Sequence, residues 1–126
     1  MSFVPEDLLR SFELRAEEQA AQARRLSARI EQSTATAESP GGEVTVTVDS
    51  TGGLADLRFG AAAERLALDR LAALVLETSC RAQAEIAKQV GDLVSETYGL
   101  GSPTAAFVSG AYADRFGGEP EREEAR

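Results

Sequence analysis

The sequence contains no histidine and no tryptophan, and its 126 residues include a single cysteine and a single lysine. Histidine is the side chain most used for proton transfer near neutral pH, so its absence excludes hydrolytic triads of the usual type. The chain has no Cys/His cluster, and we therefore expect no metal and no cofactor. Lys88 follows Glu85 and precedes Asp92 on an expected helix, a setting typical of an ion pair between residues four apart. We predict a protein without enzymatic activity and without a small-molecule substrate.

The scarcity of cysteine, of long apolar runs and of aromatic residues indicates where the protein is located and what it can bind. Cys80 has no second cysteine to pair with, and its place in an apolar helical pattern predicts a small buried residue in a reducing setting. No segment approaches the roughly 18 consecutive apolar residues that a membrane span needs, and the first ten residues do not resemble a secretory signal. We therefore expect no membrane partner and a cytoplasmic location. Because aromatic residues are few, a single-strand binder that stacks bases is disfavoured.

Negative charge dominates the chain. The formal net charge is −8 and the sequence pI is near 4.6. A net negative charge argues against the class of strongly basic proteins that coat nucleic acid through their overall charge. Any binding of anions must therefore come from a local basic patch.

The stretch from Glu43 to Phe59 carries the strongest structural signal. Residues 44–48 alternate valine with polar residues, which predicts a strand with one aliphatic face. Residues 49–53 read DSTGG, a turn signal, and apolar residues alternate again over 55–59. The pattern predicts a β-hairpin with one apolar face, which needs a further strand and an apolar cover to be stable.

Two long helical patterns flank this hairpin. The first should begin near Pro5 and run for roughly 25 residues, too long for a small globule to cover along its whole length. One set of mostly apolar residues has the a/d spacing of a thin coiled-coil seam, formed by Leu9, Phe12, Ala16, Gln19, Ala23, Leu26 and Ile30. Part of this helix should therefore project or pack against another chain.

The remaining elements complete the expected fold. Residues 31–38 predict a short, weakly apolar strand, and Ser39–Gly42 predicts a break after it. Helical spacing extends over 61–98, either as one helix or as a helix that begins near 68–71, and a Gly-Leu-Gly stop follows. We predict an α+β fold with an α-β-β-β-α protomer, in which two long helices flank a three-stranded antiparallel meander. The protomers should form a homodimer, since one protomer cannot cover the seam and the hairpin face.

The C-terminal segment has a different character from the rest. We place the boundary of the main domain at residue 102, so that residues 1–102 form the domain and 103–126 an extension. The extension shows no sustained periodicity, and its last ten residues have a composition typical of disorder.

Arginines on the first helix form the strongest candidate site. Arg24, Arg25 and Arg29 fall within two turns and make a local positive spot where the helix leads into the sheet. Arginine forks suit phosphate oxygens, although a solvated, salt-bridged face is an equally valid interpretation. The full candidate set for contacts with DNA phosphates is Arg10, Arg15, Arg24, Arg25, Arg29, Arg81 and Lys88.

The order of elements, with GGEVTVTVDSTGGLADLRF followed by the helix LAALVLETSCRAQAEIAKQVGDLVSETYGL, resembles the YbaB/EbfC family of bacterial nucleoid-associated proteins. The resemblance covers about residues 8–102. It implies a dimer with a tweezer-like body whose helical prongs bind double-stranded DNA and influence nucleoid organisation or transcription. The acidity and the single lysine depart from this expectation, and so does the extension from Phe107 to Arg126.

Two functional hypotheses remain open. The first is a non-enzymatic, nucleoid-associated DNA-binding dimer with little sequence specificity, because no identifiable recognition helix carries a set of side chains for base edges. The alternative is a protein-interaction dimer of the same fold without DNA affinity, such as an accessory protein of a specialised secretion system. Both hypotheses use the same arginines, for a phosphate backbone or for an acidic protein partner.

Overall fold

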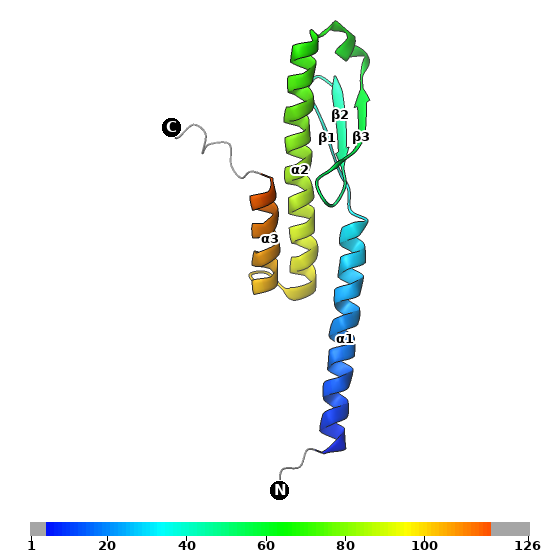
Figure 1. Cartoon of the computed structure of the whole chain (residues 1–126), viewed down its shortest axis with the longest axis vertical. Helices are drawn as coiled ribbons and strands as arrows, with labels where there is room; N and C mark the ends of the chain where they lie inside the picture. Colours follow the sequence, from blue (N-terminus) through cyan, green and yellow to red (C-terminus); the bar gives the residue numbers. More distant parts are fainter. Residues whose placement is uncertain (1–4, 117–126) are drawn as a thin grey trace, which may run out of the picture.

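The computed structural model describes residues 5–116. Along the chain these residues form helix α1 (Glu6–Glu31), strands β1 (Ala35–Glu38), β2 (Val44–Val48) and β3 (Leu54–Phe59), a short 3-10 helix η1 (Ala61–Arg65), and helices α2 (Leu68–Tyr98) and α3 (Pro103–Arg115). The strands form one antiparallel sheet in the order β1-β2-β3. The α+β fold, in which a three-stranded antiparallel meander follows one long helix and precedes another, is therefore confirmed; α2 lies along the sheet, whereas α1 continues beyond the end of the sheet (Figure 1).

The core lies between the central strand and α2. All three valines of β2 point to the face that α2 covers and are fully or almost fully buried. On α2 the buried residues recur every fourth position, a row formed by Leu74, Thr78, Ala82, Ile86, Val90 and Val94. Strict alternation on a strand and a four-residue step on a helix each put apolar side chains on one face, and these two faces pack together.

Asp49 organises the turn between β2 and β3. Its carboxylate accepts hydrogen bonds from the Thr51 hydroxyl, the Thr51 amide and the Gly53 amide at 2.6, 2.9 and 3.0 Å. The bond from the Thr51 hydroxyl is the main reason that the pKa of Asp49 lies below its ordinary value. Gly52 adopts φ 85°, a conformation that other residues rarely take, so the predicted turn signal is confirmed with a specific role for each residue.

The third strand has two features that the sequence pattern does not predict. An irregularity between Thr47 and Val48 shifts the register, so that Val48 pairs with Leu54 and not with Ala55. The apolar side chains of this edge strand are also less covered than an apolar hairpin face implies, since Leu54 and Phe59 are 56% and 53% exposed. The sheet is thus well covered over β2 and open at its β3 edge.

Helix α1 has a packed part and a projecting part. Near its C-terminal end Leu26 is buried in the core and Ile30 is half-buried against it. The N-terminal half extends well beyond the end of α2 (Figure 1), and residues 5–20 are exposed throughout. The expected projection is confirmed, whereas most of the a/d seam, including Leu9 and Phe12, is uncovered in the protomer.

Helix α2 follows one of the two predicted arrangements and overturns one prediction. It begins at Leu68 after η1, and it ends at Tyr98, where Gly99 has φ 94°. Cys80, however, is exposed, so the prediction of a buried cysteine is wrong. Cys80 is two residues from both Thr78 and Ala82, which places it about 200° around the helix axis from the buried row.

The segment after residue 102 contains a helix that the sequence pattern does not predict. Ser102 caps it by accepting a hydrogen bond from the Ala105 amide, with Pro103 in the first turn. Helix α3 runs back along α2, and the Tyr112 hydroxyl donates a 2.7 Å hydrogen bond to the Ser50 carbonyl in the β2–β3 turn. Burial raises the pKa of the Tyr112 phenol. The predicted disorder of the last ten residues lies outside the described residues.

Replacing Thr78 by valine is expected to stabilise the protein by about 1 kcal/mol. The Thr78 side chain is 1% exposed, and its hydroxyl is the one buried side-chain polar atom in residues 5–116 without a hydrogen-bond partner. Valine has the same shape and removes the desolvated hydroxyl. Chemical denaturation measures the change. Thr97→Val is the control, because that hydroxyl donates to the Leu93 carbonyl and its loss should not stabilise the protein; an equal gain in both variants would contradict the explanation.

Candidate nucleic-acid interface

Charge divides α1 into two parts that coincide with its projecting and packed halves. We call residues 6–18 the arm and residues 19–31 the root. Acidic residues outnumber basic ones in the arm, which carries Glu6, Asp7, Glu13, Glu17 and Glu18 against Arg10 and Arg15. The root reverses the sign, with Arg24, Arg25 and Arg29 against Glu31. The positive end of the helix is therefore the end that joins the sheet, and the part that projects is negative.

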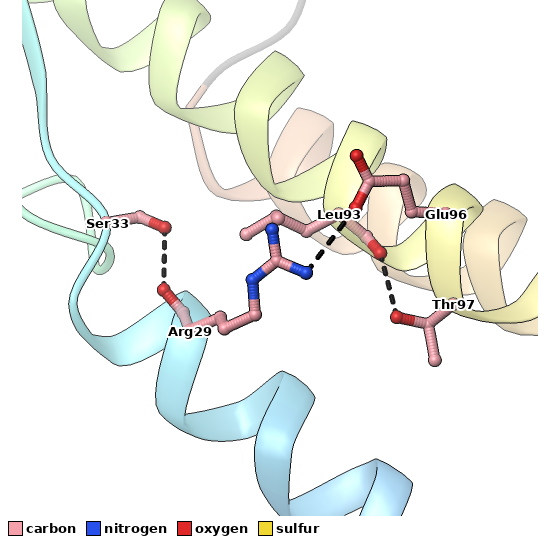
Figure 2. Close-up of polar contacts among 5 residues, drawn as sticks. All are labelled: Arg29, Ser33, Leu93, Glu96 and Thr97. Carbon is pink, nitrogen blue, oxygen red and sulfur yellow. Dashed lines mark hydrogen bonds and ion pairs between the residues drawn. The ribbon is translucent and has the colours of Figure 1, made fainter.

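The three root arginines differ in their surroundings. Arg24 and Arg25 are exposed, and neither takes part in an ion pair within residues 5–116. Arg29 reaches from α1 to α2, where its Nη1 lies 3.4 Å from Glu96 Oε1 (Figure 2). The backbone carbonyl of Arg29 also accepts a 2.9 Å hydrogen bond from the Ser33 hydroxyl at the end of the helix.

A groove runs between the root and the end of α2. We call it the root groove; it is lined by Gln22, Arg25, Leu26, Arg29, Glu96 and Thr97. It combines two guanidinium groups, a side-chain amide and a hydroxyl around a floor that Leu26 provides. These groups can donate hydrogen bonds to an anion, and Glu96 is the one carboxylate on its rim.

The spacing of the root arginines lowers the stability of helix α1. Arg25 and Arg29 are four residues apart on one helix, a spacing at which like charges destabilise a helix. Arg29, the basic residue of the last turn, compensates for part of this, since its charge interacts favourably with the helix dipole. Glu96 offsets the repulsion at Arg29 only. The contacts within residues 5–116 therefore offset the repulsion between Arg25 and Arg29 only in part.

The structure keeps the other candidate residues apart from this cluster. Arg10 and Arg15 are exposed on the arm among its carboxylates. Arg81 donates a 2.6 Å hydrogen bond to the Glu38 carbonyl at the end of β1. Lys88 forms an ion pair of 3.8 Å with Asp92 one turn along α2, as the sequence pattern predicts. Thus Arg25 and Arg29 line one groove, Arg24 is exposed beside them on the root, and Arg81 and Lys88 have local partners.

Sequence reasoning missed the contribution of α2 to the root groove. Glu96 is 67 residues from Arg29, and no local spacing connects the two. Gln22 could have been found, because it precedes Leu26 by one helical turn and so shares its face. Thr97 carries no such signal.

Other site chemistries find no support in the part of the chain that is described. Residues 5–116 hold no group of three or more side chains of the His, Cys, Asp or Glu type that could bind a metal ion. None of the helices in the same range carries an apolar stretch of the length that a lipid bilayer requires.

Comparison with known proteins identifies the family. No curated protein sequence gives a significant match to the chain. The profile of the YbaB/EbfC DNA-binding family matches residues 10–100, which include most of α1, the whole sheet and α2. The chain therefore belongs to the YbaB/EbfC DNA-binding family of nucleoid-associated proteins.

Proposed function

We propose that this protein binds double-stranded DNA through phosphate contacts made by the root of α1, with little sequence specificity. The observation that carries the proposal is the exposure of Arg24 and Arg25, which form no ion pair with residues 5–116 although the chain as a whole is acidic. Family membership supports the same conclusion. Guanidinium groups bind phosphate oxygens through two parallel hydrogen bonds, so three arginines within two turns suit a short stretch of backbone.

Low specificity follows from the kind of contact. Contacts with phosphates position a protein on the duplex without reporting the sequence, which is read from base edges in the grooves. Gln22, the glutamine next to the arginines, lines the root groove against α2 and is only half-exposed. It is therefore poorly placed to reach a base edge. A role in organising the nucleoid or modulating transcription would therefore depend on where the protein accumulates and not on a recognition motif.

The functional unit in this proposal is a cytoplasmic homodimer located on the nucleoid. The arm exposes Leu9 and Phe12, and the β3 edge exposes Leu54 and Phe59, so the protomer has apolar surface that a second copy would cover. Residues 1–102 would form the domain that dimerises and binds DNA. Two copies of the root at a fixed separation would contact the same duplex.

A second candidate function is a protein-interaction dimer without DNA affinity, such as a secretion accessory protein. The observation that favours it is the arm, where exposed apolar side chains lie among acidic ones. A duplex repels such a surface, whereas a basic, apolar protein partner would suit it.

A gel-shift titration on duplexes of unrelated sequence separates the two candidates. We expect every duplex to shift at low salt, with an affinity that falls as salt rises because cations bound to the phosphates are released. Six contacts, three from each copy of the root in the dimer, predict a slope of roughly −5 when the logarithm of the association constant is plotted against the logarithm of salt concentration. The absence of any shift at low salt with tens of micromolar protein would exclude the DNA-binding proposal and leave the protein-interaction candidate.

A further inference from the structure

The contact between Arg29 and Glu96 differs from the other ion pairs in the described residues. Those pairs join residues of a single element, Arg58 with Asp56 on β3 and Lys88 with Asp92 on α2. Arg29 and Glu96 instead join two helices, and they connect the proposed phosphate-binding root to a carboxylate on the facing helix (Figure 2). The acidic partner is thus brought by the fold to one of the three arginines of the root.

The geometry of this pair is that of a weak, replaceable contact. A single nitrogen of Arg29 approaches a single oxygen of Glu96 at 3.4 Å, and the two side chains are 57% and 65% exposed. A bidentate, buried pair would be much stronger. A phosphate group presents to a guanidinium the same kind of anionic oxygen as a carboxylate does, and it can use both nitrogens of the fork.

The surrounding root groove offers further donors to an anion in this position. Arg25 and Gln22 lie on its α1 side and Thr97 on its α2 side. The Thr97 hydroxyl now donates to the Leu93 carbonyl at 3.1 Å (Figure 2), a bond that it can exchange for one to an incoming oxygen by rotation about χ1. The groove therefore fits a phosphate group, and Glu96 is the one acidic side chain among its lining residues.

We propose that the root groove is a phosphate subsite and that Glu96 competes with the phosphate for Arg29. Glu96 pairs with Arg29 in the free protein, and a phosphate of the ligand replaces Glu96 on binding. The proposal rests on the proposed function, since it names the groups that receive one phosphate of the duplex. It adds that binding breaks the Arg29–Glu96 pair. Glu96 consequently lowers the affinity for DNA beyond its effect on the net charge.

The test compares two substitutions with the same change of charge. Glu96→Gln is expected to tighten duplex binding at low salt about two- to fivefold, the range that corresponds to the strength of an exposed ion pair. Glu77→Gln is the matched control, because Glu77 is an exposed glutamate of the same helix without an ion pair in residues 5–116. Equal gains in the two variants would show a bulk charge effect and overturn the proposal.

A second substitution tests whether the effect acts through Arg29. In an Arg29→Gln background the additional change Glu96→Gln should raise the affinity for the duplex no more than Glu77→Gln does. The reason is that Glu96 has no ion pair with residue 29 in that background. A full gain in that background would also overturn the proposal.

A probe other than DNA separates this inference from the proposed function. Pyrophosphate is added to the full chain while the Arg29 side-chain N–H resonance is followed by NMR. We expect the resonance to shift at a lower pyrophosphate concentration in Glu96→Gln than in the unchanged protein, whether or not a duplex binds. An Arg29 resonance that does not respond in either protein would refute the phosphate subsite even if DNA binds elsewhere.

Discussion

Replacing Ile86 by alanine is expected to lower the free energy of unfolding by about 2–5 kcal/mol. Ile86 is among the largest side chains that are completely buried, and it lies in the middle of the row of α2 that packs on β2. The substitution removes three carbon atoms from a contact between two regular elements that cannot easily collapse into the space, so the cost of a cavity adds to the lost burial. A loss of this size is a large part of the stability of a typical domain.

Chemical denaturation at a fixed protein concentration measures this loss, since the stability of an oligomer depends on concentration. Glu85→Ala is the control, because it changes the neighbouring residue on the exposed side of the same helix and should alter the stability by less than about 0.5 kcal/mol. A loss below about 1 kcal/mol for Ile86→Ala would show that α2 and β2 do not form the main core.

Replacing Arg24, Arg25 and Arg29 together by glutamate should weaken the binding of duplex DNA at least about 100-fold at low salt. Each lost phosphate contact accounts for roughly a fivefold change, and the three changes in one protomer already multiply to this value because each arginine contacts its own phosphate. The second copy of the root adds to the loss, and the slope of affinity against salt should decrease by roughly five counterions in the dimer. Gel shift at several salt concentrations gives both quantities, and circular dichroism shows whether α1 remains helical.

Arg10→Glu with Arg15→Glu provides a control on the same helix, with two charge reversals against three in the root variant. Both residues lie on the acidic arm, so we expect at most about a fivefold loss from this pair. If instead the arm variant loses more affinity than the root variant, the phosphate site belongs to the arm. Unchanged affinity in the root variant would rule out the root as the site.

The parts of the fold that the sequence predicts are those set by local patterns. Alternating valines over 44–48, the turn residues after Asp49 and the stop at Gly99 each act within a few residues, and the structure has each of them in place. The three root arginines belong to this group, because their proximity follows from helical spacing alone. The positive spot on α1 could therefore be predicted without knowledge of its neighbours.

The parts that the sequence misses depend on contacts between distant segments. Helix α3 is poor in charge and has no clear period of its own, and it is held by its packing on α2 and by the bond from Tyr112 to Ser50. The wrong prediction for Cys80 arose because α2 is apolar on more than one side, which hides which side faces the sheet. The pairing of Glu96 with Arg29 has the same origin, since only the packing of α1 on α2 brings the two together.

The bond between Tyr112 and Ser50 has a consequence for the order in which the chain folds. The hydrogen bonds that define the β2–β3 turn are local, because Asp49 and the glycines need no distant partner, although the hairpin still requires the cover of α2. The far side of the turn is covered by Tyr112 on α3, which is 62 residues from Ser50, and by Phe116 directly after that helix. Contacts of such sequence separation form late, because the intervening chain must first be ordered. We therefore expect that α3 packs last and that it covers the β2–β3 turn after α2 has packed on the sheet.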